Sequence, residues 1–311
     1  MSSAPLDVPT WAWLLFAGIV VGSLALDLWV HRGGRGLSRK QAIVWSIAWI
    51  SVALLFALWV GVTFGPNAAL DYVTAYAIEK SLSVDNLFLF IVIFGRLKIP
   101  EAEQHRVLFW GILGAFATRG AFIAAGTALL AAWHPVVYAL GALLVYAGIK
   151  TAREPFDADA GEGRILPFLR RHLPLTARNH GHHFFVVEGG RRLATPLLLA
   201  LLVIEITDVV FAVDSIPAAL AVTDVPFIVY SSNVFAVLGL RALYLVLARA
   251  LMGLKYLRYG LGGILAFAGL KMLTSAFISI PHVASLLVIV AFMVGAILPS
   301  VIARRRAAAA S

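Results

Sequence analysis

Residues Glu205 to Pro217 read EITDVVFAVDSIP and continue an apolar run that begins at Leu197. Three carboxylates, Glu205, Asp208 and Asp214, therefore fall within one stretch of membrane-spanning length. A charged side chain at the centre of a bilayer costs at least about 2.5–3.5 kcal/mol on insertion scales. Three of them in one span need pairing, protonation or a cation to compensate, so we expect this stretch to carry the function.

The composition of the chain is that of an integral membrane protein. Of 311 residues, 61% are hydrophobic and 13% charged, which is too apolar for a water-soluble domain of this length. A transmembrane helix needs about 20 mostly apolar residues. The sequence predicts an all-α membrane helix bundle of nine spans, at residues 11–30, 42–64, 71–94, 107–131, 134–150, 195–220, 228–248, 259–279 and 283–302. The first span lacks a basic segment before it and an A-x-A-like cleavage site, so we expect a retained helix.

Basic residues predict the orientation of the bundle. Most of the 25 Lys and Arg residues lie in alternate loops, whereas the loops near 1–10, 65–70, 132–134, 221–227 and 280–282 contain none. Because cytoplasmic loops are enriched in Lys and Arg, we expect the N-terminus outside and the C-terminus in the cytoplasm. The net charge of +9 then reflects membrane topology, and we do not expect a nucleic-acid partner.

The residue types limit the chemistry. The chain has no cysteine, which excludes disulfides, covalent haem attachment and thiolate metal sites and leaves oxygen and imidazole as ligands. No Ser/His/Asp, H-E-x-x-H or nucleotide-loop pattern is present. We therefore expect neither an enzyme nor a bound cofactor.

Spans three to five repeat as spans six to eight. VDNL at 84–87 matches VDSI at 213–216, and the same offset places Glu79 on Asp208; Arg119 matches Arg241, and LGALLVYAGIK at 140–150 matches LGGILAFAGLK at 261–271. A unit of three spans must cross the membrane inverted in its second copy, which is typical of secondary transporters, although duplicated helices also build proteins that do not transport.

The predicted division of the single transmembrane domain, residues 1–311, is a first repeat at 71–151, a cytoplasmic loop at 152–194, a second repeat at 195–280, and a last helix with a basic tail at 281–311.

The acids of the predicted spans indicate a cation site. Oxygen ligands favour Mn²⁺, Mg²⁺ or Ca²⁺, and loss of protons as the metal binds would couple the two fluxes. We expect Asp85 and Asp214 to ligate the cation and Glu79, Glu205 and Asp208 to act as ligands or proton carriers. The other charged residues inside spans are possible counter-ions or gating residues: Asp27, Lys80, Arg119, Arg241 and Lys271. Asp27 could instead be an interfacial acid that pairs with Arg32.

Two further features are less specific. Pro217 removes a hydrogen bond to the carbonyl of Val213, so we expect the sixth span to be kinked or unwound around 212–217, with carbonyls free to act as ligands. The loop at 152–193 contains His180, His182 and His183. These histidines could bind a metal, but beside many arginines they are more typical of a solvated or lipid-contacting surface.

At its acidic spans the chain resembles the TerC family of membrane proteins, which includes Alx-type manganese exporters and is grouped with LysE-like exporters. The resemblance is carried by EKSLSVDNLF at 79–88, TPLLLALLVIEITDVVFAVDSIPAALAVT at 195–223, PFIVYSSNVFAVLGLRALY at 226–244 and GLKML at 269–273, and it extends from Asp27 onward.

The resemblance implies Mn²⁺ efflux across a bacterial inner membrane, with the site on Glu79, Asp85, Glu205, Asp208 and Asp214 and with Asn86, Ser215 and Asn233 in the same motifs. Members differ in the ion or phenotype attributed to them, tellurium resistance among these. The alternatives are export of another ion such as Ca²⁺, or a non-transporting membrane partner for the assembly or metallation of other proteins. The oligomeric state does not follow from the sequence.

Overall fold

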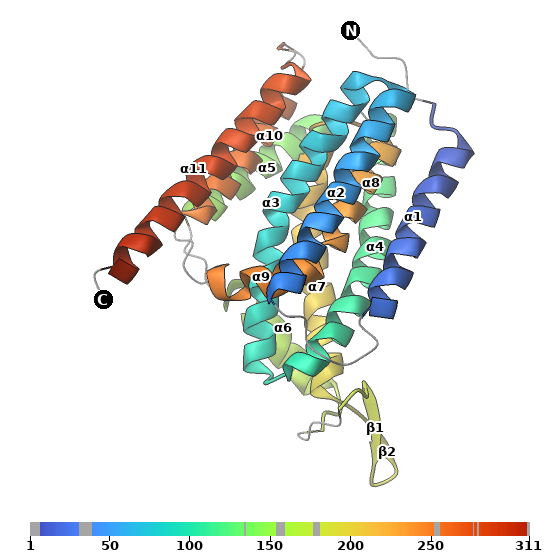
Figure 1. Ribbon diagram of the computed structural model, residues 1–311, viewed down its shortest axis with the longest axis vertical. Helices are drawn as coiled ribbons and strands as arrows, with labels where there is room; N and C mark the ends of the chain where they lie inside the picture. Colours follow the sequence, from blue (N-terminus) through green and yellow to red (C-terminus); the bar gives the residue numbers. More distant parts are fainter. Residues whose placement is uncertain are drawn as a thin grey trace.

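The protein is an all-α membrane bundle, as the sequence predicted (Figure 1). A computed structural model describes residues 7–30, 39–133, 135–153, 159–176, 181–251, 256–275, 277–278 and 280–309. Within these ranges the side chains of Asp85 and Asp214 lie outside the description. The helices are α1 (Thr10–Val30), α2 (Arg39–Phe64), α3 (Pro66–Arg96), α4 (Glu101–Ala132), α5 (Val136–Arg153), α6 (Asp159–His172), α7 (Pro196–Leu220), α8 (Pro226–Leu238), α9 (Leu240–Leu251), α10 (Leu257–Thr274) and α11 (His282–Ala309).

Among the described residues, six helices are long and apolar enough to cross a membrane by themselves: α1, α2, α4, α5, α7 and α11. The predicted span at 228–248 is wrong as one helix, because α8 ends at Leu238 and α9 begins at Leu240. The break falls at Gly239, where a Cβ atom would lie only 3.0 Å from Nζ of Lys80 and 3.3 Å from Cβ of Trp49. α9 then runs across the bundle (Figure 1).

α7 is a continuous helix through the segment that we expected to unwind. It begins at Pro196, which suits a first-turn position, after the N-cap Thr195. Pro217 lies in its last turn, so only the bond to the carbonyl of Val213 is lost. The N–H of Ala221 donates to the carbonyl of Pro217 over 2.9 Å and completes the helix end. The prediction of an unwound segment at 212–217 is therefore wrong.

α5 and α10 pack backbone to backbone. A Cβ atom at Gly269 would lie 2.5 Å from the carbonyl oxygen of Gly141, and one at Gly262 would lie 2.5 Å from that of Gly148. Glycine permits this approach because it has no side chain, as at helix interfaces in membranes. The two helices form a tight pair next to α3, α7 and α11.

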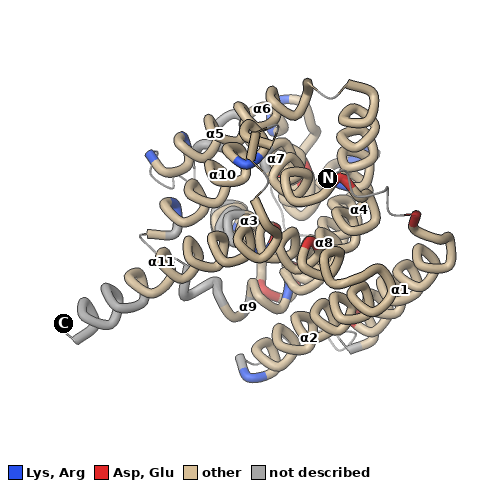
Figure 2. Tube along the Cα trace, turned by 90° about the horizontal axis from the view of Figure 1, so that it is seen from above, with Lys and Arg blue, Asp and Glu red and all other residues tan. Residues whose placement is uncertain are grey.

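The segment between α5 and α7 forms a small cap at one end of the bundle. It contains α6 and an antiparallel hairpin of β1 (Phe185–Glu188) and β2 (Arg191–Ala194). Leu169 of α6 is buried in the main core, while the hairpin projects beyond the helices (Figure 1). From above, several acidic positions lie in the interior of the bundle, among α3, α7 and α8 (Figure 2). The candidate site is built on these inner helices.

Candidate cation site

A buried arginine joins the two acidic helices. Nη1 of Arg119, on α4, donates to both carboxylate oxygens of Glu79 on α3, over 2.6 and 3.0 Å. Its Nε and Nη2 donate to Asp208 on α7, over 3.1 and 2.8 Å. Arg119 and Glu79 are each only 1% exposed. The paired acids that the repeat superposes therefore meet at one guanidinium.

Two amides extend this network. Nδ2 of Asn233, on α8, donates to Oε1 of Glu79 over 2.8 Å, and Nδ2 of Asn86 donates to Oδ1 of Asp208 over 3.3 Å. Two carboxylates thus share one guanidinium and neutral donors, which leaves a formal charge of −1. Such a cluster attracts a cation, because its negative charge is not fully balanced.

A cavity of about 70 Å³ adjoins the network. Its polar lining comes from Glu79, Ser83, Asn86, Arg119, Thr151 and Ser215. The hydroxyls of Ser83 and Ser215 are buried and have no hydrogen-bond partner in the part of the chain that the structure describes. The space can hold a small cation with some of its water, since about 10–15 Å³ suffices for one water. Carboxylate, amide and hydroxyl oxygens are the ligands that hard divalent cations prefer.

The backbone positions of Asp85 and Asp214 are near this cavity, because each residue is adjacent in sequence to a residue that lines it, Asn86 and Ser215. Each comes six residues after a member of the network, Asp85 after Glu79 on α3 and Asp214 after Asp208 on α7. Six residues advance a helix by about 9 Å. Among the described side chains, no group of three or more His, Asp or Glu could hold a metal ion. The two aspartates, which we predicted as cation ligands, fall outside the described side chains.

Glu205 lies one turn before Asp208 on α7 and is half-buried. It fits against Gly114 of α4, where a Cβ atom would lie 2.0 Å from its Oε1. Sequence analysis missed Gly114, Ser83 and Thr151, because a glycine and two hydroxyl residues in apolar helices resemble ordinary packing residues.

Arg241 and Lys80 bond to groups outside the network. Arg241 donates to Asp27 over 2.5 Å and to His105 over 3.2 Å, joining α9 to α1 and α4. Arg32, the alternative partner of Asp27, lies outside the described residues. Lys80 donates to the carbonyl of Ala236 over 3.0 Å.

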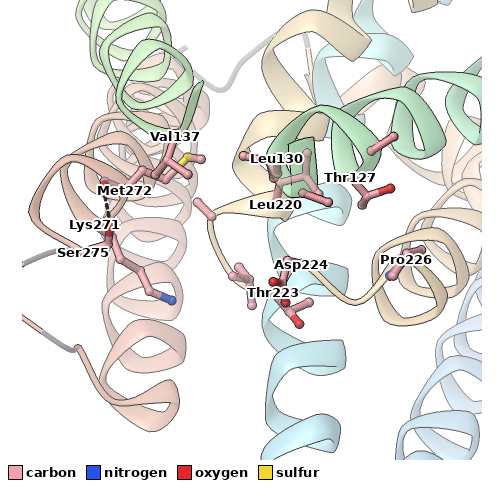
Figure 3. Close-up of a pocket in the computed structure, with 14 residues that line it drawn as sticks. Thr127, Leu130, Val137, Leu220, Thr223, Asp224, Pro226, Lys271, Met272 and Ser275 are labelled. Atoms are coloured by element: carbon pink, nitrogen blue, oxygen red, sulfur yellow. Dashed lines mark hydrogen bonds between the residues drawn. The ribbon is translucent and has the colours of Figure 1, made fainter. Parts of the chain in front are cut away.

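Lys271 lines a second and larger cavity of about 660 Å³, between α4, α5, α7, α8 and α10 (Figure 3). Its polar lining also includes Thr223 and Asp224. One buried apolar cluster extends from Met272, which lines this cavity, to Leu265, which lines the small one, and includes Ile78. Apolar side chains therefore lie between the larger cavity and the network.

The histidines of the loop at 152–193 contribute little to this geometry. His180 lies outside the described residues, whereas His182 is 68% exposed in its side chain and contacts Glu103 over 2.9 Å.

Comparison with known proteins identifies similar chains over most of the length. The model of a family described as "Integral membrane protein TerC family" matches residues 64–308. "Uncharacterized membrane protein STKORF319" of Myxococcus xanthus is 48% identical over 95% of this chain and 93% of its own. "Putative membrane-bound redox modulator Alx" is 44% identical in Salmonella typhi, over 88% of each chain, and 42% identical in Escherichia coli K12, over 91% of each. No solved structure matches.

Proposed function

The chain belongs to the TerC family of integral membrane proteins, and from this premise we propose that it is a secondary transporter that exports a divalent metal cation. Mn²⁺ is the first candidate, in exchange for protons. The proposed location is a bacterial inner membrane, with the N-terminus outside. The observation that supports this function best is the network in which Arg119 joins Glu79 to Asp208.

In this proposal Arg119 and the transported cation compete for the same oxygens. The guanidinium lies between two carboxylates from different halves of the chain, beside a cavity with hydroxyls that no described residue hydrogen-bonds. An arriving cation would take over the carboxylates, with Asp85 and Asp214 as further ligands. After the cation leaves, Arg119 would return, so the acids are never left unpaired in the membrane. A proton on Glu205, Asp85 or Asp214 would be lost as the metal binds, which would couple the cation to a proton flux.

The proposed alternating access rests on an inverted repeat. By the sequence match, Gly262 is the counterpart of Gly141 and Gly269 that of Gly148. Gly141 contacts Gly269, which is the counterpart of Gly148, and Gly148 contacts Gly262, which is the counterpart of Gly141. α4 likewise packs on α7, and α8 on α3. Such reciprocal contacts are what a two-fold relation between repeats predicts, and they support a mechanism in which one half rocks against the other.

A second candidate function is a non-transporting membrane partner for the assembly or metallation of other proteins. It is favoured by the same network, because both oxygens of Glu79 and of Asp208 accept hydrogen bonds, as in a purely structural ion pair.

Some relatives carry the words "redox modulator" in their names. This chain has no cysteine, so we propose that any redox effect would arise from a redox-active cation that it moves.

Binding of Mn²⁺ to the purified protein tests the proposal. Free Mn²⁺ can be followed by electron paramagnetic resonance with wild type, with Asp85→Asn/Asp214→Asn, and with the control Asp224→Asn in the larger cavity. We expect the double variant to bind at least about tenfold more weakly and the control to match wild type. Folded wild type without Mn²⁺, Mg²⁺ or Ca²⁺ binding would favour the assembly partner, and equal binding by the double variant would contradict the assigned ligands.

A further inference from the structure

A third cavity, of about 360 Å³, lies where α3 ends and α7 begins, beside α6. Lys98 lies in the turn after α3, with φ of 51°, and Arg170 lies in the last turn of α6. Both line this cavity and both are exposed. The cation site does not use either residue, so their placement calls for a separate account.

The two basic side chains have no partner within the part of the chain that the structure describes. Among the described residues, neither the ammonium of Lys98 nor the guanidinium of Arg170 has a hydrogen-bond or ion-pair partner. The lining residue Thr176 donates a hydrogen bond to Glu188 over 3.2 Å, and none of the lining residues is itself an acid. Two positively charged side chains that line one cavity indicate a binding site for an anion. Basic pockets between transmembrane helices bind lipid head groups in this way.

Apart from Thr176, the rest of the cavity lining is apolar. Leu97, Leu175 and Leu199 line it, so a bound anion would lie against hydrocarbon. Phe168, in the same helix as Arg170, is 60% exposed. An exposed aromatic side chain beside basic residues is typical of a helix at a membrane surface, and α6 lies at the end of the bundle (Figure 1).

We propose that this cavity binds an anionic phospholipid, with Lys98 and Arg170 on the headgroup phosphate and an acyl chain along the leucines. A free phosphate would satisfy the charges but leave the apolar lining unused. The site does not depend on the transport proposal. It does join the ends of α3 and α7, the helices that carry Glu79 and Asp208, so an occupied site would hold those ends together.

Native mass spectrometry of the full-length, delipidated protein tests the site by titration with phosphatidylglycerol or phosphatidylcholine. We expect wild type to retain phosphatidylglycerol preferentially. Lys98→Ala/Arg170→Ala should lose about 30-fold in affinity for it, or about 2 kcal/mol, since one basic residue near an anionic surface contributes about 1 kcal/mol. The control Arg191→Ala/Arg192→Ala removes the same charge from the hairpin and should behave as wild type.

Two further measurements separate lipid binding from a folding defect and from binding of free phosphate. Lys98→Arg/Arg170→Lys keeps both charges and should retain the lipid, which separates loss of charge from a folding defect. Inorganic phosphate at millimolar concentration should not displace it. The proposal is overturned if the alanine variant binds phosphatidylglycerol as wild type does, if the hairpin control loses the lipid equally, or if phosphate alone competes fully and so identifies a free-anion site.

Discussion

Arg119 is the residue that links the two halves of the proposed cation site. Its four hydrogen bonds are divided equally between Glu79 and Asp208, inside the protein. A buried ion pair is often no more stable than apolar residues of the same volume, so stability alone is a poor reason for it. In the proposed mechanism, competition with a transported cation would give the arginine a role that an apolar residue could not fill.

Substitution of Arg119 by Gln should expose this competition. Loss of one partner of a buried ion pair costs about 3–5 kcal/mol, so the unfolding temperature, read from tryptophan fluorescence, should fall. Millimolar Mn²⁺ should restore much of it, because the cation can take the place of the guanidinium.

Arg241→Gln is the matched control for that experiment. It removes a buried arginine that pairs with Asp27, and Mn²⁺ should not restore its stability. Equal recovery of both variants, or of neither, would argue against a cation at the network.

At this scale the acids could be predicted from the sequence, because carboxylates in apolar runs require a partner. The different roles of Arg119 and Arg241 could not. They match in the repeat, yet Arg241 follows the break at Gly239 and is carried by α9 toward Asp27. A hydropathy pattern does not contain that break, since LGLRALY reads as a continuous span.

Among the elements, the α5 and α10 pair is the most constrained by packing. In Gly262→Ala the new Cβ atom would meet the backbone of Gly148 at 2.5 Å, and a backbone cannot rotate away. The helices must separate, at a cost of about 1–3 kcal/mol for overpacking. Gly22→Ala on α1 adds a methyl group where nothing lies within 4 Å, and should be neutral or stabilising by up to about 1 kcal/mol. Detergent unfolding curves compare the two; similar midpoints would contradict the close approach.

The helices themselves followed from apolar runs and proline positions, whereas the shape of α7 did not. Pro217 suggested an unwound segment, but a proline in a last turn removes a single bond, and Ala221 closes the end. The sequence alone shows that Pro217 removes the hydrogen bond to Val213. Whether that loss unwinds the helix depends on the distance of Pro217 from the helix end, which the sequence does not give.

For the whole molecule, the proposed orientation in the membrane can be tested by chemical labelling. Because the chain lacks cysteine, single cysteines can report it. Asp224→Cys, at the larger cavity, should react with a membrane-impermeant maleimide in intact cells. Arg191→Cys, on the hairpin, should react only after the cells are permeabilised. The reverse pattern would contradict the proposed topology.

The most direct test of the central claim is Mn²⁺ movement into proteoliposomes that contain the purified protein and an internal Mn²⁺ indicator, under an imposed pH gradient. We predict gradient-dependent movement with wild type and none with folded Asp85→Asn/Asp214→Asn. A folded wild type that moves neither Mn²⁺, Ca²⁺ nor Mg²⁺, or a double variant that transports as wild type does, would contradict transport through the paired acids.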